Sequence, residues 1–249
     1  MHPEYSLGYR LLYRRHWWWR ARETFILDAI GRLFPSGTAG RILDVGCGDG
    51  LIFDKLVRFG AVEGIEMDQA AVSPTGPWAS HIRLHAFDET FEPGHPYALV
   101  LLLDVLEHFA RPLDCLRRAV QLIAPDGAIL ITVPAFRALW TSHDVLNRHF
   151  TRYTRRSLSK LAWQAGARVE TCRYFFHWTF PVKLAQRLKE SVTQSPPEVP
   201  RIPPEKLNRA LYRLSVFEQK AISRWPIPFG SSLLAVLRRD ALEPFRVNR

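Results

Sequence analysis

Three glycines at alternate positions follow an apolar run, and this junction constrains the fold more than any other part of the chain. The run Arg41–Val45 is followed by Gly46, Gly48 and Gly50, and an amphipathic run begins at Leu51. Glycine permits positive φ and close approach of a ligand to the backbone. The order of strand, glycine turn and helix predicts a βα unit that binds a nucleotide-like ligand over the carboxyl end of a sheet.

The glycine spacing distinguishes among nucleotide ligands. A dinucleotide fingerprint reads G-x-G-x-x-G, whereas this turn reads G-x-G-x-G, which argues against a nicotinamide-dependent oxidoreductase. Asp44 lies near the end of the first strand, where its carboxylate can meet an amino group. Glu66 follows 22 residues later, and an acid at that distance suits two ribose hydroxyls. The residues therefore favour an adenosine-type ligand that carries an amino-acid moiety and no pyrophosphate.

The segment Leu43–Gly50 resembles the first motif of the class I S-adenosylmethionine-dependent methyltransferases. The resemblance implies S-adenosyl-L-methionine as the cofactor. It also implies that the carboxylates of Asp44 and Glu66 bind its methionine and ribose parts, and that Asp88 accepts a bond from the adenine amino group. The segment Leu103–His108 is similar to the family's segment where cofactor meets substrate. The expected cofactor-binding residues are Asp44, Gly46, Cys47, Gly48, Gly50, Glu66, Met67, Asp88, Leu103 and Asp104.

A second resemblance is carried by three segments, His16–Arg22, Leu139–Asp144 and His149–Arg155. They are similar to those of a bacterial subgroup of this family that has a broad likeness to the ubiquinone-biosynthesis O-methyltransferases. The resemblance of the core spans roughly residues 40–175. It implies a methyltransferase that acts on a small-molecule or lipid-linked acceptor, at oxygen.

An oxygen acceptor often needs a base to remove its proton. His143, Asp144 and His149 lie in the segment expected to close over the acceptor, and we expect them to be catalytic. Asp144 directly follows His143, so these two side chains need not meet, and His149 is the alternative partner. Hydrogen bonding of this loop to a helix that begins at Thr154 is the competing interpretation. The expected substrate-binding residues are Trp18, Arg22, His108, Trp140 and Tyr153.

The middle of the chain alternates between strand and helix patterns, which predicts a parallel sheet covered on both faces. We expect an α/β, Rossmann-like, mostly parallel seven-stranded sheet with helices on both faces, an N-terminal aromatic helix and a helical C-terminal insertion. The strands are expected at 41–45, 62–67, 82–85, 98–103, 128–133, 169–176 and 232–237.

The whole chain, residues 1–249, is expected to form a single methyltransferase domain. Within it we expect a helical cap over 1–38 and a cofactor-binding core over 39–180. A basic helical insertion should occupy 181–230, where prolines separate two helical patterns. A closing strand and tail should occupy 231–249.

Aromatic residues are concentrated in two segments. A helix is expected over 5–33, and Trp17, Trp18 and Trp19 cannot all face one core, because successive helical residues point about 100° apart. At least one should face a cleft or a partner. The segment Phe175–Pro181 fits a membrane interface, a single-stranded nucleic acid or an aromatic core.

The net charge of +10 is unevenly distributed. Residues 1–136 carry 13 Lys and Arg against 16 Asp and Glu, whereas residues 137–249 carry 21 against 8. A basic half attracts an anionic membrane surface, a phosphorylated lipid or sugar carrier, or nucleic acid, although a simply solvated surface is the alternative. An RNA methyltransferase that uses this half, and a non-catalytic binding protein of the same fold, therefore remain open. Nucleic acid is less favoured because no RRM, KH or zinc module is recognisable.

The three cysteines, Cys47, Cys115 and Cys172, fit neither a disulfide framework nor a zinc site. We expect no metal. The sequence contains no uncharged apolar stretch of membrane-spanning length, and arginines interrupt any signal-peptide core near the N-terminus. We expect a cytoplasmic protein with possible peripheral contact at the inner face of the membrane.

Overall fold

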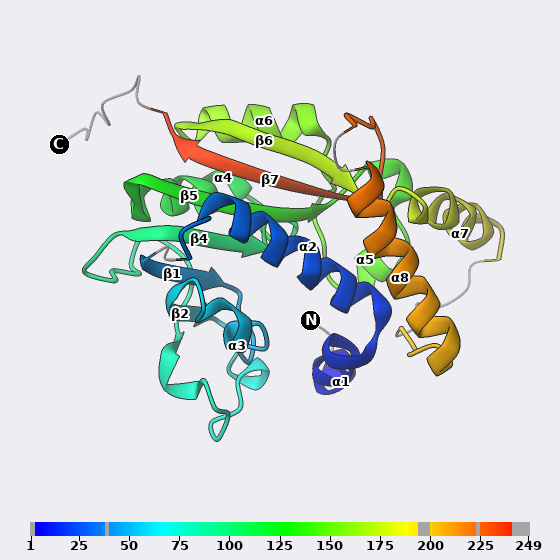
Figure 1. Ribbon diagram of the computed structural model, residues 1–249, viewed down its shortest axis with the longest axis horizontal. Helices are drawn as coiled ribbons and strands as arrows, with labels where there is room; N and C mark the ends of the chain where they lie inside the picture. The colour runs from blue at the N-terminus through cyan, green and yellow to red at the C-terminus, as the bar shows by residue number, and fades with distance from the viewer. Residues whose placement is uncertain (1–2, 38–39, 194–199, 223–224, 241–249) are drawn as a thin grey trace.

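A seven-stranded sheet with the order β3-β2-β1-β4-β5-β7-β6 forms the centre of the computed structural model, which describes residues 3–37, 40–193, 200–222 and 225–240 (Figure 1). The strands β1 to β5 pair in parallel, and β7 runs antiparallel to both β5 and β6. The mostly parallel, seven-stranded prediction is confirmed. The strands are β1 Gly40–Val45, β2 Gly60–Glu66, β3 Ile82–Leu84, β4 Tyr97–Leu103, β5 Ile123–Pro134, β6 Ala167–Phe175 and β7 Ser232–Arg239.

The chain reverses its direction of travel across the sheet at β1. This strand pairs with β2 on one side and with β4 on the other, so Asp44 lies between Gly64 and Leu101. Ligands of open α/β sheets bind outside the carboxyl ends of the strands at such a switch point. The expected cofactor residues follow β1, β2 and β4 and therefore meet at this edge.

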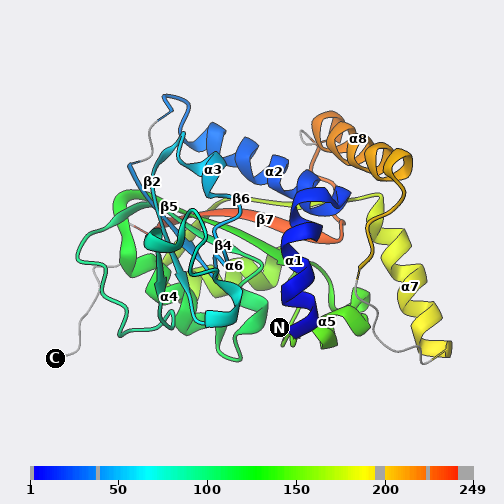
Figure 2. The ribbon, with the colours of Figure 1, turned by 90° about the horizontal axis from the view of Figure 1, so that it is seen from below.

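Helices cover both faces of the sheet, as the sequence predicts (Figure 2). Successive strand residues point to opposite faces, so each strand supplies two apolar clusters. On one face α2 (Trp17–Leu33) and α3 (Phe53–Leu56) pack on residues such as Ile42 and Leu101. On the other face α4 (Pro112–Leu122) and α6 (Arg155–Gln164) pack on the alternate residues, among them Leu43 and Val100.

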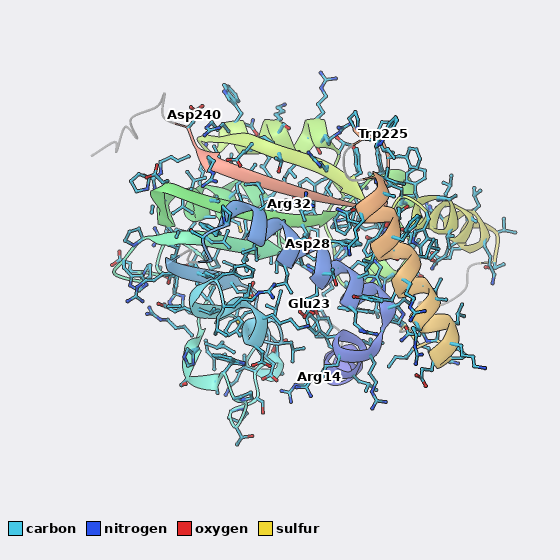
Figure 3. All side chains as sticks on the ribbon, viewed as in Figure 1. Arg14, Glu23, Asp28, Arg32, Trp225 and Asp240 are labelled. Carbon is cyan, nitrogen blue, oxygen red and sulfur yellow. The ribbon has the colours of Figure 1, made fainter. Side chains whose placement is uncertain are left out.

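The N-terminal segment forms two helices instead of the single helix expected over 5–33. The helix α1 (Pro3–Arg15) is followed by His16, whose Nδ1 accepts a hydrogen bond of 3.1 Å from the backbone N–H of Trp18 and so caps α2. Glu23 of α2 is labelled in Figure 3; its carboxylate accepts a 2.8 Å bond from the Tyr13 hydroxyl and pairs with Lys55 of α3. These contacts join α1, α2 and α3 to one another.

The expected pair of C-terminal helices is present as α7 (Thr179–Thr193) and α8 (Glu205–Ile222). The side-chain amide of Asn208 joins α8 to the break between α1 and α2. It accepts a hydrogen bond of 2.8 Å from the Trp17 N–H and donates one of 2.7 Å to the Arg15 carbonyl. Phe175 and Phe176 are buried in a cluster with residues of α2 and α8, among them Phe25 and Val216. The aromatic-core interpretation of this segment is therefore correct for those two rings.

The remaining helical segments are short. They include α5 (Ser142–Leu146) and the 3-10 turns at Gln69–Ala71, Ala79–His81, Leu106–His108 and Arg137–Leu139. The helix expected after the glycine turn shrinks to α3, since turns occupy the residues on either side of it. Across the described ranges, no helix combines the length and apolar character that a bilayer span requires.

Candidate functional site

A cavity of about 1470 Å³ opens at the carboxyl ends of β1, β2 and β4. The helices α1, α2, α5 and α7 contribute its other walls, so the cap, the core and the C-terminal insertion all reach it. Of the residues predicted for the site, the lining contains Trp18, Gly46, Cys47, Gly48, Glu66, Met67, Leu103, Asp104, His108, His143 and His149. Asp44, Gly50, Asp88, Arg22, Trp140, Asp144 and Tyr153 lie outside the lining.

The glycine turn forms the floor of the cofactor half. Gly46 and Gly48 have φ of 65° and 54°, in the left-handed region that favours glycine. A Cβ added at Gly48 would meet no atom within 4 Å, so this backbone faces open space. A Cβ at Gly50 would meet the ring of Phe53 at 3.0 Å, so that glycine serves packing of α3. The turn thus offers a bare backbone surface to a ligand.

Two carboxylates lie at the adjacent strand ends. Glu66 lines the cavity, and its two oxygens accept bonds of 2.9 Å each from the backbone N–H groups of Gly48 and Asp68. Asp44 is buried behind the turn and accepts no hydrogen bond from the described residues. Burial raises the pKa of Asp44 to about 7, with Glu66 adding to the rise and Arg22 opposing it. The site therefore contains a carboxyl group that lacks a donor.

The side chains after β2 and β3 differ in their exposure. Met67 is 77% exposed and lines the cavity. His85 and Phe87 also reach the lining. Asp88 lies in an exposed turn, where its Oδ1 accepts bonds of 2.9 and 2.5 Å from the N–H and hydroxyl of Thr90. Asp88 lies outside the cavity lining, and its adenine contact stays a prediction.

Asp104 is held at the rim of the cavity by two partners from distant elements. Its carboxylate forms an ion pair with Nε of Arg22 at 2.9 Å. It also accepts a hydrogen bond of 3.1 Å from the Thr132 hydroxyl, and that hydroxyl accepts a hydrogen bond of 2.8 Å from Nη2 of Arg22. Asp104 has a φ of 58°, a conformation that costs energy outside glycine and that these contacts stabilise. Arg22, predicted to bind substrate, is buried and orients Asp104 instead of lining the cavity.

The catalytic candidates converge on one buried carboxylate. Asp144 accepts a hydrogen bond of 2.9 Å from Nδ1 of His149. Its Oδ1 also accepts one of 2.8 Å from Nε of Arg152, and its Oδ2 accepts one of 2.8 Å from Nη2 of Arg152. The backbone N–H of Thr141 donates a further 2.8 Å bond. These hydrogen bonds lower the pKa of Asp144 well below its usual range despite its burial. The partner of Asp144 is therefore His149, and His143 instead hydrogen-bonds Asn147.

A possible metal-binding set lies beside this dyad. One ligand atom from each of Glu107, His108 and His149 lies within 4.8 Å of the others. Both carboxylate oxygens of Glu107 are buried without a hydrogen-bond partner in the described structure. Burial and the neighbouring Asp104 carboxylate raise the pKa of Glu107 well above its usual range. The sequence prediction of no metal stays a prediction, since these three residues could hold one.

The other predicted substrate residues are divided by the fold. Trp18 lines the cavity, stacks on Phe176 at 5.6 Å, and buries its Nε1–H without a described acceptor. Trp140 lies outside the lining under the guanidinium of Arg137. Tyr153 is a core residue whose hydroxyl donates 3.1 Å to the Leu106 carbonyl.

Sequence reasoning missed the contribution of α7. This helix brings Lys183, Gln186, Lys189, Glu190 and Thr193 into the lining. They recur at helical spacing along one face, a signal present in the sequence. Nothing in the pattern shows that this face would meet the cavity, because the contact is tertiary.

The comparisons with known proteins agree with the geometry. The family model described as "Methyltransferase domain" matches residues 18–171. A Ubiquinone biosynthesis O-methyltransferase of Yersinia enterocolitica is 31% identical over 119 residues, which are 45% of this chain and 48% of that protein. Its counterpart in Citrobacter koseri is 30% identical with the same coverage. The chain spans about half the length of the curated relatives it matches.

Solved structures resemble the fold over nearly the whole chain. The CcbJ methyltransferase from Streptomyces caelestis has a TM-score of 0.53 and 15% identity, covering 89% of this chain and 90% of that chain. The (4+2)-cyclase SpnF has a TM-score of 0.58 and 17% identity, covering 95% and 94%. Likeness at such identities shows the fold alone.

Proposed function

The chain belongs to the class I S-adenosylmethionine-dependent methyltransferases, and from that premise we propose that it methylates an oxygen atom of a small-molecule or lipid-linked acceptor. The observation that carries the proposal is the Asp144–His149 pair, which supplies an oriented base in the cavity that also contains the glycine turn. The relatives named as O-methyltransferases support oxygen as the accepting atom.

The cofactor half fits S-adenosyl-L-methionine. Each Glu66 oxygen accepts one backbone N–H, which leaves lone pairs for two ribose hydroxyls. The exposed Met67 would cover the adenine, and the open space over Gly48 would admit the chain of the ligand. The amino group of the methionine part would provide the donor that Asp44 lacks and would lower the pKa of that carboxyl. Gly46, Cys47, Leu103 and Asp104 complete the proposed contacts.

His149 would act as the general base. When bound, S-adenosyl-L-methionine supplies a methyl carbon that bonds to the acceptor oxygen as its bond to sulfur breaks, which leaves S-adenosylhomocysteine and a methyl ether. Asp144 accepts from Nδ1 of His149, and no described residue hydrogen-bonds Nε2, so Nε2 can take the hydroxyl proton. Asp144 also stabilises the resulting imidazolium, and Arg152 holds Asp144 in place. Burial lowers the pKa of His108 to about 4, so this adjacent ring stays neutral and does not repel the new charge.

The test of this base uses transfer of a labelled methyl group to a panel of hydroxylated aromatic compounds and to a bacterial lipid extract. His149→Gln should lower kcat by about 10²- to 10⁴-fold and remove the dependence of kcat on protonation of a base. The exposed His81 provides the control, because His81→Gln leaves the cavity intact. His143→Gln should have the smaller effect, since the ring of His143 hydrogen-bonds Asn147, whereas Asp144 accepts from the ring of His149.

Calorimetric titration with S-adenosylhomocysteine separates cofactor binding from catalysis. His149→Gln should bind it as the wild type does, whereas Asp44→Ala should abolish binding. Unchanged affinity in Asp44→Ala would reject the cofactor assignment. A His149→Gln variant with wild-type kcat at every pH would reject the base.

A peripheral membrane location supports a lipid-linked acceptor. The helices α7 and α8 expose apolar side chains such as Leu188 (62%) and Phe217 (70%) next to basic residues, and Trp225 beyond α8 is 72% exposed (Figure 3). Apolar and cationic side chains together suit the interface of an anionic bilayer. We propose that these exposed side chains contact the inner surface of the cytoplasmic membrane.

Sedimentation with phosphatidylglycerol vesicles tests this location. The protein should bind at low salt and dissociate as salt rises, because screening weakens contacts between exposed charges. Phe217→Ser should weaken binding, whereas Trp163→Ser on α6 should not, although that indole is 73% exposed. Absence of sedimentation at low salt would remove the membrane proposal and leave a small-molecule acceptor.

A further inference from the structure

The wall of the cavity opposite the cofactor half is rich in cations. Lys183, Lys189, Arg148 and Arg201 all belong to the lining. Among the described residues, none of these four forms an ion pair with a carboxylate. The acid that α7 contributes, Glu190, accepts bonds from the N–H and hydroxyl of Ser142 at 2.8 and 3.1 Å. This wall therefore carries positive charge that the described chain does not neutralise.

Lys183 is the innermost of these cations. Its ammonium group interacts electrostatically with Arg152, Asp144 and Asp104, and it also influences His143. Both carboxylates are already engaged, because Asp144 bonds Arg152 and His149, and Asp104 bonds Arg22 and Thr132. Burial, reinforced by Arg152, lowers the pKa of Lys183 to about 8. A partly buried ammonium that lacks its own anion is a costly arrangement unless a ligand supplies one.

The two ends of the cavity thus differ in sign. The cofactor half is lined by Glu66 and Asp68, and by Asp49, which pairs with Arg10 at 3.0 Å. The Glu66 carboxylate suits the ribose hydroxyls of the methyl donor. The half next to α7 is lined by Lys183, Lys189 and other cations. A neutral acceptor would leave those cations without a counter-charge, whereas an anionic acceptor would provide it.

We propose that the acceptor carries an anionic group, a phosphate or a carboxylate, which binds to Lys183, with Lys189 and Arg201 drawing it in at the wider part of the same wall. This inference rests on the proposed function. Lys183 shares the cavity lining with Asp104 and His149, so an anionic group bound to Lys183 would lie in the same cavity as the methylated hydroxyl. Lys183 is then a substrate-binding residue that decides between charged and neutral acceptors.

Calorimetry with three small probes tests the anion site on the full-length protein. Phenyl phosphate and benzoate represent the two anionic groups, and phenol is the neutral control. One of the two anions should bind more tightly than phenol. Which anion binds shows whether the acceptor carries a phosphate or a carboxylate. Lys183→Met should lower the affinity for that anion by about tenfold or more, and tenfold is equivalent to about 1.4 kcal/mol. Lys183→Arg, which retains the charge, should restore most of the affinity.

The matched control lies on the same helix. Arg187 is exposed on α7 but lies outside the cavity lining, so Arg187→Met removes a charge of equal sign without touching the site. Equal losses in Lys183→Met and Arg187→Met, or anions that bind no better than phenol, would overturn the proposal. Binding of S-adenosylhomocysteine is measured in each protein. A wild-type protein that does not bind it would contradict the proposed function, whereas the anion measurement would still test the anion site independently.

Discussion

The buried Asp144–Arg152 pair gives the sharpest quantitative prediction, the free energy lost when Asp144 becomes Asn. The exposed fractions of the two side chains are 0% and 1%, and two hydrogen bonds of 2.8 Å join them. Asn would turn an amide N–H₂ toward the guanidinium, and it would leave a buried positive charge without its anion. Removing one partner of such a pair costs about 3–5 kcal/mol. Asp144→Asn should therefore lower the free energy of unfolding by about that amount.

Chemical denaturation at pH 7 measures this loss, and a second pair of the same residue types provides the control. Asp114 pairs with Arg111 at 3.1 Å, but their side chains are 55% and 87% exposed. Asp114→Asn should change the free energy of unfolding by about 0–1 kcal/mol. Arg152→Met combined with Asp144→Asn should cost less than the sum of the single changes, because no unpaired buried charge remains.

The pH dependence adds a signature that packing alone would not give. The folded-state pKa of Asp144 is depressed, so its contribution to stability is present above the unfolded value of about 3.9 and is lost as pH falls below it. The difference in the free energy of unfolding between wild type and Asp144→Asn should therefore shrink as pH falls below about 3.9. A loss in Asp144→Asn that matches Asp114→Asn, or that does not depend on pH, would refute the reasoning.

Three further predictions follow from backbone contacts and from shifted pKa values. Gly60→Ala should lower the free energy of unfolding by about 1–3 kcal/mol in chemical denaturation, since the added Cβ would lie 2.0 Å from the Gly40 carbonyl oxygen. Gly8→Ala should be neutral or stabilising, because its Cβ would meet nothing within 4 Å. Similar values for the two variants would contradict this prediction. Burial raises the pKa of the Cys47 thiol, so at pH 8 a disulfide reagent should modify it far more slowly than free cysteine until the protein unfolds. The folded pKa of Asp44, about 7, lies above its unfolded value, so stability should decline as pH rises from about 4 to 7, and Asp44→Asn should flatten that slope in a denaturation series.

The core of the fold was predictable because its signals are local. The run before Gly46, the spacing to Glu66 and the apolar stretch that ends at Leu103 each specify a strand and the turn after it. The parallel pairing of these strands then brings their carboxyl ends together without further information. The Asp144–His149 contact was also predictable, because the two residues are only five positions apart and a short helix, α5, contains Asp144.

Contacts between distant segments were not predictable in this way. Arg22 appeared to be a cavity residue, but it is 82 positions from Asp104 in sequence, and only tertiary packing shows that the two form an ion pair. The break at His16 likewise depends on Asn208, which reaches it from α8. A helix pattern predicts which residues share a face, but it does not predict what that face meets.

The basic half of the chain can be divided by the same logic into two sets of charges with different physical behaviour. Arg187 and Lys220 are exposed on α7 and α8, where screening at physiological salt acts over about 8 Å and weakens any attraction to a bilayer. Lys183 lies inside the cavity, where screening is weaker and its counter-charge must come from a bound ligand. If both sets served only the membrane, salt would weaken vesicle binding and small-anion binding in parallel. Anion binding that persists at a salt concentration that releases the vesicles would show that the positive charge also selects the acceptor.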